Sequence, residues 1–398
     1  MNKKFLYEAD ILLPKANFYE WSVIACDQYT SNLKYWQEVE QIVGEKASAY
    51  NIILPEAYLS DDDSDKINKI NKTMTEYLNN GTFDLYENTL IFCERTLKNG
   101  QKRLGIIGLI DLEDYSYIKG ADTAIRATEA TVIERIPPRV NIRKDAPLEI
   151  PHVMLLIDDP NDTVIEPVSE KTENFKKVYD FKLMQNAGSI KGYSLDGDTI
   201  SQVQTALSEL ESKSEDGLLF AVGDGNHSLA SAKECYNQGF GPRYALVEIV
   251  NIHDSSLEFE PIYRVLFGTE PETVISDFVN YCGGEYNGSD AQKFTCYYGK
   301  EKKTIAVKAK GALPIATLQT FLDEYLIDKK DVKLDYIHGI DSTIELSKNE
   351  NTLGFIFEGM SKSDLFTAVS KDGSLPRKTF SMGCADDKRF YLEARKIK

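Results

Sequence analysis

The segment Asp224-Gly225-Asn226-His227 places a carboxylate and an imidazole within one short turn. The apolar residues 218–222 before it predict a buried strand, and the apolar spacing of residues 229–236 predicts a helix from Ser228 onward. The first turn of a helix has backbone N–H groups that bind anions such as phosphate. We therefore predict a phosphate or nucleotide site at residues 223–228. The alternative is an ordinary connection in which Asp224 or Asn226 only caps the helix.

A second group of residues with chemical potential is the basic segment 126–143. It contains several arginines in a chain whose net charge is −17, namely Arg126, Arg135, Arg139 and Arg143. Arginine suits bidentate recognition of carboxylates and phosphates, and Glu129 among them is a candidate general base. The alternative is that these arginines pair with the surplus carboxylates, which we favour for at least two of them.

Composition limits the classes of function. The 398 residues predict about two or three structural units, and 42% hydrophobic with 27% charged residues are typical of a globular protein. The net charge of −17 argues against nucleic acid and anionic membrane surfaces as partners, but it allows a small anionic substrate. No apolar run approaches the roughly 20 residues of a membrane span. The six cysteines form no CxxC pair, and this favours a reducing cytoplasm.

Several well-known sites are absent from the sequence. There is no GxxxxGK[ST] phosphate loop, no complete dinucleotide glycine fingerprint and no GxSxG elbow. The four histidines do not cluster, so we expect no metal site built from histidines. Mg²⁺ held by carboxylates and phosphates would leave no trace in the sequence. His152 follows a proline at the start of a predicted strand, where we expect a structural role.

Strand patterns outnumber clean strand-helix-strand units. Residues 89–97 and 103–112 predict a hairpin around Asn99-Gly100, and a further set of strands is expected at 151–158, 243–250, 262–267 and 353–357. Helices are expected at 67–78, 274–281 and 318–326. We therefore predict an α+β fold with mixed sheets. Its expected regions are 1–150, 151–268 with the DGNH turn, and 269–398, or else one compact unit.

Six motifs in a fixed order carry a resemblance to a known family. They are residues 25–30, 126–139, 224–227, 261–265, 336–339 and 375–379. The chain resembles the bacterial family catalogued as domain of unknown function 1015. The central motif of that family, usually Asp-Gly-His-His-Arg, is similar to the Gly-x-His-Arg box of the ParB/sulfiredoxin superfamily. That superfamily includes nucleotide-dependent free-serine kinases, whose box opens a helix and holds nucleotide phosphates.

The resemblance implies roles for particular residues. Asp224, Gly225 and His227 match the central motif, whereas Asn226 replaces its first His and Ser228 replaces its Arg. Glu129 matches the Glu of a His-Glu-x-Thr motif of the family. In that motif, Thr128 stands in place of the His and Thr131 matches the Thr. The fold that the resemblance implies is α+β, with a ParB/sulfiredoxin-like core motif and large additional segments.

The function that the resemblance implies is phosphoryl transfer in serine or phosphoserine metabolism, as a phosphoserine phosphatase or a serine-kinase-like enzyme. Catalytic roles fall to Glu129, His227 and Asp224, with Mg²⁺ and a nucleotide as expected cofactors. We expect Glu129 and His227 to converge with Asp27 on one pocket. The expected substrate- or phosphate-binding residues are Asp27, Gln28, Arg126, Arg139, Gly225, Asn226, Ser228, His338, Arg377 and Lys378. The alternative is a non-catalytic regulatory protein that binds a small anion or nucleotide, and a homo-oligomer stays open.

Overall fold

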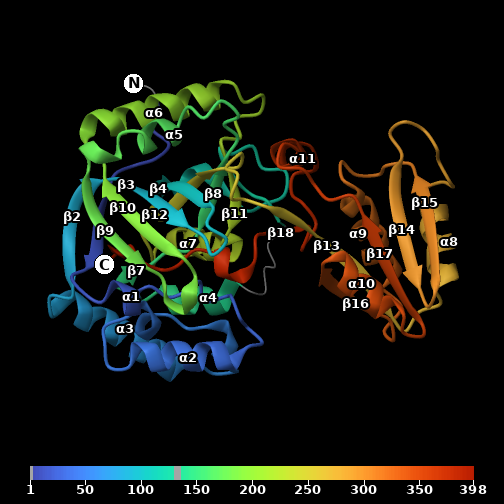
Figure 1. Ribbon diagram of the computed structural model, residues 1–398, viewed down its shortest axis with the longest axis horizontal. Helices are drawn as coiled ribbons and strands as arrows, with labels where there is room; N and C mark the ends of the chain where they lie inside the picture. Colours follow the sequence, from blue (N-terminus) through green and yellow to red (C-terminus); the bar gives the residue numbers. More distant parts are fainter. Residues whose placement is uncertain (1–2, 130–135) are drawn as a thin grey trace. The chain divides into compact units, whose positions relative to one another are not determined.

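The computed structural model describes residues 3–129 and 136–398, which form two units (Figure 1). Unit 1 comprises Met1–Leu257 together with Gly383–Lys398, and unit 2 comprises Glu258–Met382. Unit 2 is therefore inserted between two segments of unit 1, and the second of these is the C-terminal one. We call Gly383–Lys398 the return segment. Thr131 of the expected Glu-x-Thr motif lies outside the described residues.

Unit 1 is organised around a nine-stranded mixed sheet with the order β5-β6-β11-β8-β12-β4-β3-β10-β9. Strand β11 pairs in parallel with β6 and antiparallel with β8, and β8 pairs in parallel with β12. The strands are β3 Ile91–Thr96, β4 Lys102–Asp111, β5 Tyr115–Ser116, β6 Ile125–Ala127, β8 Met154–Ile157, β9 Lys176–Lys182, β10 Ser189–Ser194, β11 Phe220–Asp224 and β12 Tyr244–Asn251. Two short ribbons, β1 Ala9–Pro14 with β2 Phe83–Thr89 and β7 Leu148–Glu149 with β19 Arg395–Lys396, complete the unit.

Both faces of this sheet are buried, and successive side chains of β3 serve different faces. Ile91 and Cys93 belong to one apolar cluster, whereas Phe92 belongs to the other. This alternation follows from the two-residue period of a strand. The antiparallel β3–β4 hairpin closes through Gly100, whose φ of 87° suits glycine.

Helices cover the two faces of the sheet (Figure 1). Helices α2 and α3 pack in the cluster that contains Ile91, and α6 packs in the cluster that contains Phe92. Helix α7 contributes Leu229 to the second cluster, while its Ala230 packs against α4. The helices of unit 1 are α1 Phe18–Trp21, α2 Leu33–Val43, α3 Ser64–Asn79, α4 Ile136–Arg143, α5 Glu166–Ser169, α6 Gly197–Ser212 and α7 Asn226–Asn237.

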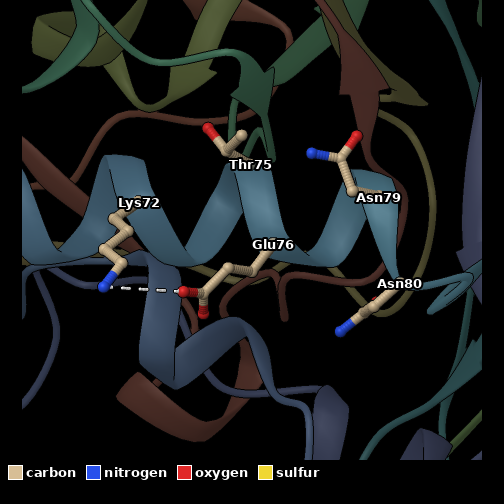
Figure 2. A pocket seen from close by; sticks show the side chains of 5 residues that line it. All are labelled: Lys72, Thr75, Glu76, Asn79 and Asn80. Carbon is tan, nitrogen blue, oxygen red and sulfur yellow. Dashed lines mark ion pairs between the residues drawn. The ribbon is translucent and has the colours of Figure 1, made fainter.

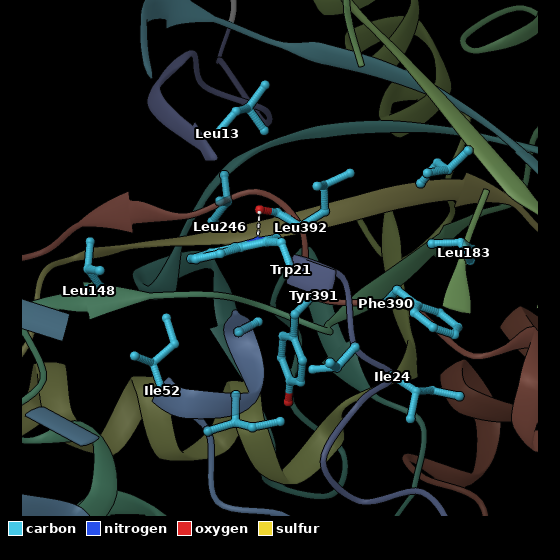
Figure 3. Packing of buried hydrophobic residues seen from close by; sticks show 14 of the residues in the cluster. Leu13, Trp21, Ile24, Ile52, Leu148, Leu183, Leu246, Phe390, Tyr391 and Leu392 are labelled. Carbon is cyan, nitrogen blue, oxygen red and sulfur yellow. Dashed lines mark hydrogen bonds between the residues drawn. The ribbon is translucent and has the colours of Figure 1, made fainter. Parts of the chain in front are cut away.

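Trp21 is fully buried in the first cluster, where apolar side chains of the sheet and of the return segment surround it (Figure 3). Its indole N–H donates to the carbonyl of Leu392 at 3.0 Å, which ties α1 to the return segment. Figure 3 also shows Tyr391 with its ring among these side chains and its hydroxyl at the end remote from Trp21. The return segment is therefore part of the core of unit 1.

Unit 2 is built on an antiparallel sheet with the order β15-β14-β17-β13-β16, and β18 pairs with the start of β13. Its strands are β13 Phe259–Phe267, β14 Gln292–Tyr298, β15 Glu301–Val307, β16 Lys333–His338, β17 Thr352–Phe357 and β18 Phe380–Met382. Its helices are α8 Pro271–Tyr281, α9 Pro314–Tyr325, α10 Ile340–Ser347 and α11 Asp364–Asp372. The buried Phe278, Phe294 and Phe355 pack edge to face at its centre.

The prediction of an α+β fold with mixed sheets is confirmed. The predicted hairpin forms, and the strand, turn and helix around Gly225 follow one another as expected. The turn is tighter than predicted, because Asp224 still belongs to β11 and Asn226 already begins α7. Within the described residues, no helix is both long and apolar enough to cross a membrane.

Candidate functional site

The turn at Gly225 is the first element of the candidate site. Gly225 occupies the N-cap position of α7 with φ 82°, and it has no side chain with which to cap the helix. A Cβ at this position would lie 3.0 Å from the Cα of Val153, next to β8. Glycine is therefore required both by its backbone angle and by the close approach of β8. The uncapped first turn of α7 faces outward from this point with a partial positive charge.

Asp224 and Lys388 meet at the end of β11. The Oδ1 of Asp224 accepts the backbone N–H of Gly225 at 2.9 Å, and its Oδ2 lies 3.5 Å from the Nζ of Lys388. Only 15% of the Asp224 side chain and 14% of the Lys388 side chain are exposed. The ammonium group comes from the return segment, so two parts of the chain that are far apart in sequence form this corner.

Asp27 lies beside the same lysine. Burial alone would raise the pKa of Asp27, but the charge of His152, a hydrogen bond from Gln28 and the charge of Lys388 lower it below its ordinary value. The Nε2 of Gln28 donates to Asp27 Oδ1 at 3.0 Å. Asp27 is therefore an ionised carboxylate at neutral pH. Lys388 contacts Asp224, and its charge also lowers the pKa of Asp27.

His152 lies between Tyr391 and the turn. Its Nδ1 is 2.7 Å from the hydroxyl of Tyr391, which also accepts the backbone N–H of Cys26 at 3.3 Å. On the other side of the ring, the Cδ2 of His152 would lie 3.5 Å from a Cβ at Gly225. The imidazole is buried, and its Cδ2 atom faces Gly225 while its Nδ1 faces Tyr391. His152 is thus a polar wall of the candidate site, in addition to the structural role that we expected for it.

Thr128, the residue directly before Glu129, contacts the turn. The backbone N–H of Thr128 donates to the Oδ1 of Asn226 at 3.3 Å, and the hydroxyl of Thr128 donates to the carbonyl of Val222 at 2.7 Å. His227 and Ser228 lie in the first turn of α7, where both are partly exposed. Thr128 thus links the segment that carries Glu129 to the turn, and the convergence of Asp27, Glu129 and His227 on one pocket stays a prediction.

The arginines of the basic segment form ion pairs. Arg126 is buried and bonds to Asp216 Oδ2 at 2.5 Å, to the carbonyl of Asp216 at 2.8 Å and to that of Thr123 at 2.9 Å. Arg139 pairs with Glu56, and Arg143 pairs with Glu149. Arg135 lies outside the described residues. Pairing with carboxylates, the alternative that we favoured for at least two of these arginines, is thus found for three.

Arg139 still lies near the candidate site. The backbone N–H of its partner Glu56 donates to the carbonyl of Cys26 at 2.8 Å, directly before Asp27. Burial, together with the nearby carboxylates of Asp27 and Glu56, raises the pKa of the Cys26 thiol to about 12, so this thiol stays protonated. Through Glu56 and Cys26, Arg139 is linked to the segment that carries Asp27.

The three remaining predicted residues belong to unit 2. His338 is exposed at the end of β16, and Arg377 pairs with Asp323 at 3.1 Å. Lys378 has a φ of 56°, in the left-handed region. The buried Arg264 holds this turn, since its guanidinium donates to the carbonyls of Arg377 at 2.9 Å and Lys378 at 3.0 Å. Arg377 and Lys378 therefore come together at Arg264, whereas His338 lies opposite Ile262 at the end of β16.

One hollow on the surface lies elsewhere. It measures about 610 Å³, and side chains of α3 and the residue that follows it line it, namely Lys72, Thr75, Glu76, Asn79 and Asn80 (Figure 2). Figure 2 shows that these side chains stand along one helix, with Lys72 and Glu76 paired at 3.8 Å. The hollow contains none of the predicted site residues, and a single exposed helix gives it no convergent chemistry.

Sequence reasoning missed Lys388 and Tyr391 and gave His152 only a structural role. Within the described part of the chain, no group of three or more His, Cys, Asp or Glu side chains could hold a metal ion. Asp27 and Asp224 nevertheless supply two carboxylates beside the turn. Mg²⁺ commonly uses one or two carboxylates with phosphate oxygens, so these donors fit the ion only when a phosphate accompanies it.

Solved structures similar to this chain include a conserved hypothetical protein from Pyrococcus furiosus, with 12% identity and a TM-score of 0.39 over 73% of this chain and 95% of that chain. A mutant free serine kinase in complex with AMP has 12% identity and a TM-score of 0.43 over 72% of this chain and 90% of that chain. SbnI with C-terminal truncation from Staphylococcus aureus has 8% identity and a TM-score of 0.40 over 72% and 85%. These values are too low to assign an activity.

No curated protein matches the chain. A family model does match it, over residues 9–325, which is most of the length and includes the turn at Gly225. The chain therefore belongs to the family described as protein of unknown function DUF1015.

Proposed function

We propose that unit 1 is a phosphoryl-transfer enzyme of serine or phosphoserine metabolism that binds a phosphate or nucleotide at residues 223–228. The observation that carries the proposal is the placement of Lys388 and His152 beside the uncapped first turn of α7. In a chain of net charge −17, these groups supply the local positive potential that a phosphate needs. The serine substrate class rests on the resemblance of the DGNH turn to the free-serine-kinase box.

We assign a role in this reaction to each of these residues. The backbone N–H groups of α7, His227 and the Lys388 ammonium would bind the phosphate oxygens, and the Nε2 edge of His152 would add a donor. In the kinase direction, Glu129 would accept the proton of the serine hydroxyl as that oxygen bonds to phosphorus and the bond from phosphorus to the nucleotide oxygen breaks. In the phosphatase direction, Glu129 would accept a proton from water as the bond from phosphorus to the serine oxygen breaks, and that proton would pass to the leaving serine oxygen. Asp27, held ionised, would orient the ammonium or hydroxyl group of the substrate.

Mg²⁺, if bound with a nucleotide, would be held by Asp224 and Asp27 together with the phosphates. It would supply charge neutralisation on the transferred group. Lys388 contacts Asp224 and its charge lowers the pKa of Asp27, so the site also has a cation of its own.

The test is a titration of inorganic phosphate, AMP, ADP and phosphoserine into the parent protein and into Lys388→Ala. Phosphate release from phosphoserine and phosphoryl transfer to serine are assayed alongside. Loss of one charge-assisted contact should weaken phosphate or AMP about tenfold or more. The matched control is Lys177→Ala, which removes an exposed lysine paired with Asp180 at 2.8 Å. If the parent binds none of these compounds, the proposed site is wrong.

A specific observation favours the non-catalytic alternative. Three arginines of the segment 126–143 form ion pairs with carboxylates, and the family's Arg and first His are replaced by Ser228 and Asn226. A regulatory protein that binds a small anion or nucleotide needs the turn but not the full set of charges. Binding of AMP or phosphate without turnover of phosphoserine or serine would support this alternative.

A further inference from the structure

Three successive backbone carbonyls of the return segment are held by two buried arginines of the β3–β4 hairpin. Arg95 donates to the carbonyls of Asp386 and Lys388, both at 2.7 Å, and Arg103 donates to the carbonyl of Asp387 at 2.7 Å. The Arg95 guanidinium also lies 4.8 Å from the ring centre of Phe390. The two arginines thus fix the backbone of residues 386–388, which carries the Lys388 side chain.

This arrangement has an energetic cost. Arg95 and Arg103 are direct cross-strand partners, and only 2% and 3% of their surfaces are exposed. Like charges opposite each other in a sheet are destabilising, and burial makes each charge costlier still. Burial and the charge of Arg103 together lower the pKa of Arg95 to about 9. Apolar residues at these two positions would avoid this cost but would leave the carbonyls of 386–388 without donors.

The neighbouring residues hold the same stretch. Asp386 accepts a hydrogen bond from the hydroxyl of Tyr29, and its carboxylate lies 3.2 Å from the Nζ of Lys98. Arg389 forms ion pairs with Glu248 and Glu393, both at 2.6 Å. Between these anchors, the Lys388 side chain extends to Asp224 at 3.5 Å, a longer separation than in the neighbouring ion pairs. The backbone is therefore held firmly, while the ammonium group is held loosely.

We propose that Arg95 and Arg103 are positioning residues, which fix the backbone of the return segment so that the Lys388 ammonium stays beside Asp27 and Asp224. Neither arginine contacts the turn at Gly225; each acts through a carbonyl next to the lysine. The part of this proposal that concerns ligands rests on the proposed phosphate site. The part that concerns the position of Lys388 does not, and it can be tested without any ligand.

The ligand-free test is the rate at which an amine-acetylating reagent modifies Lys388, measured by mass spectrometry in the parent, Arg95→Lys and Arg103→Lys. The exposed Lys177 serves as the internal reference. Lysine keeps the charge but loses the planar fork, so we expect the Lys388 rate to rise about tenfold. The control is Arg395→Lys, a buried arginine of the same segment that pairs with Glu149 at 2.7 Å. Equal Lys388 rates in all four proteins would overturn the proposal.

The second test is a double-mutant cycle on phosphate and AMP affinity. If Arg103 acts through Lys388, then Arg103→Lys should weaken binding in the parent but add little in Lys388→Ala. Additive losses would show that Arg103 acts by another route. A parent protein that binds neither compound would contradict the proposed function, while the acetylation rates would still decide the positioning role. Should Arg95→Lys fail to fold, Arg103→Lys, which alters only one carbonyl contact, carries both tests.

Discussion

The hydroxyl of Tyr391 lies 2.7 Å from the Nδ1 of His152 and accepts the backbone N–H of Cys26 at 3.3 Å. Burial raises the pKa of Tyr391 well above its ordinary value, so this hydroxyl keeps its proton. With one lone pair used by Cys26, the hydroxyl can donate to Nδ1 of the neutral imidazole, and in that form the imidazole proton lies on Nε2. That nitrogen is bonded to Cδ2, the ring atom that faces Gly225.

Tyr391→Phe should therefore change the tautomer of His152 and lower stability. Removing one buried hydroxyl leaves the Cys26 N–H and the His152 Nδ1 without this partner, at a cost of about 1–3 kcal/mol. The tautomer is read from ¹⁵N chemical shifts of the imidazole, and the free energy of unfolding from urea titrations. Tyr236→Phe is the control, because that hydroxyl bonds to Glu113 at the surface. An unchanged ¹⁵N spectrum of His152 would contradict the assigned tautomer.

Gly225→Ala should lower the free energy of unfolding more than Gly239→Ala does. The φ of 82° costs a non-glycine residue about 1–2 kcal/mol, and the 3.0 Å approach to Val153 Cα adds overlap, so we expect roughly 2–4 kcal/mol in total. Gly239→Ala is the matched control, since its φ is 74° but nothing lies within 4 Å of a Cβ there. Equal losses of unfolding free energy in the two variants would show that packing against β8 contributes nothing.

Arg126→Ala should affect stability more than ligand affinity. Its guanidinium makes three hydrogen bonds to Asp216 and Thr123, so we expect a loss of about 2–3 kcal/mol in unfolding free energy. Arg139→Ala provides the comparison, because Arg139 lies near Asp27 and should alter phosphate affinity instead. The measurements are urea unfolding and calorimetric titration of phosphate for each variant. If Arg126→Ala changed the phosphate affinity strongly but left stability unchanged, Arg126 would be a phosphate-binding residue after all.

Acid should weaken the fold through Glu149. Burial alone would raise the pKa of Glu149, but the charges of Arg395 and Arg143 lower it below its ordinary value. Its contribution is therefore complete above the unfolded pKa of about 4.3 and is lost as the pH falls through the lower folded value. Unfolding free energy measured from pH 7 to pH 3 should decline at the acid end of this range.

Glu149→Gln should be less stable at pH 7 by about 3–5 kcal/mol, because the buried Arg395 and the half-buried Arg143 lose a buried charged partner. Its stability should also fall less steeply below about pH 4 than that of the parent. Glu76→Gln, at an exposed position paired with Lys72, should stay within about 0.5 kcal/mol of the parent throughout. An equally steep acid decline in parent and Glu149→Gln would assign the decline to other carboxylates.

Local patterns in the sequence were sufficient to predict the elements of the site but not its composition. The hairpin at Gly100 and the strand, turn and helix at Gly225 were predicted because hydrophobic period and glycine placement act over a few residues. The same reasoning predicted α3 from its apolar spacing. These elements depend on neighbours in sequence, and a single chain contains that information.

The contacts that complete the site join residues far apart in sequence. Lys388 meets Asp224, and Tyr391 meets His152, across separations that no periodicity reveals. Arg95 and Arg103 look like ordinary strand residues until the return segment lies against them. The boundaries expected at 150 and 268 stay predictions, but the return of the chain to unit 1 at Gly383 was not predicted. A chain that returns to its first unit after building a second leaves no compositional mark.

The insertion of unit 2 before the return segment also bears on the time course of synthesis. A ribosome adds about 5–20 residues per second, so making Glu258–Met382 takes on the order of 10 s. Throughout that interval, the nascent unit 1 lacks Leu392 over Trp21, and the carbonyls that Arg95 and Arg103 will hold do not yet exist. During this time the apolar residues that the return segment covers, such as Trp21, lack that cover, and a chaperone bound to them would protect the emerging polypeptide.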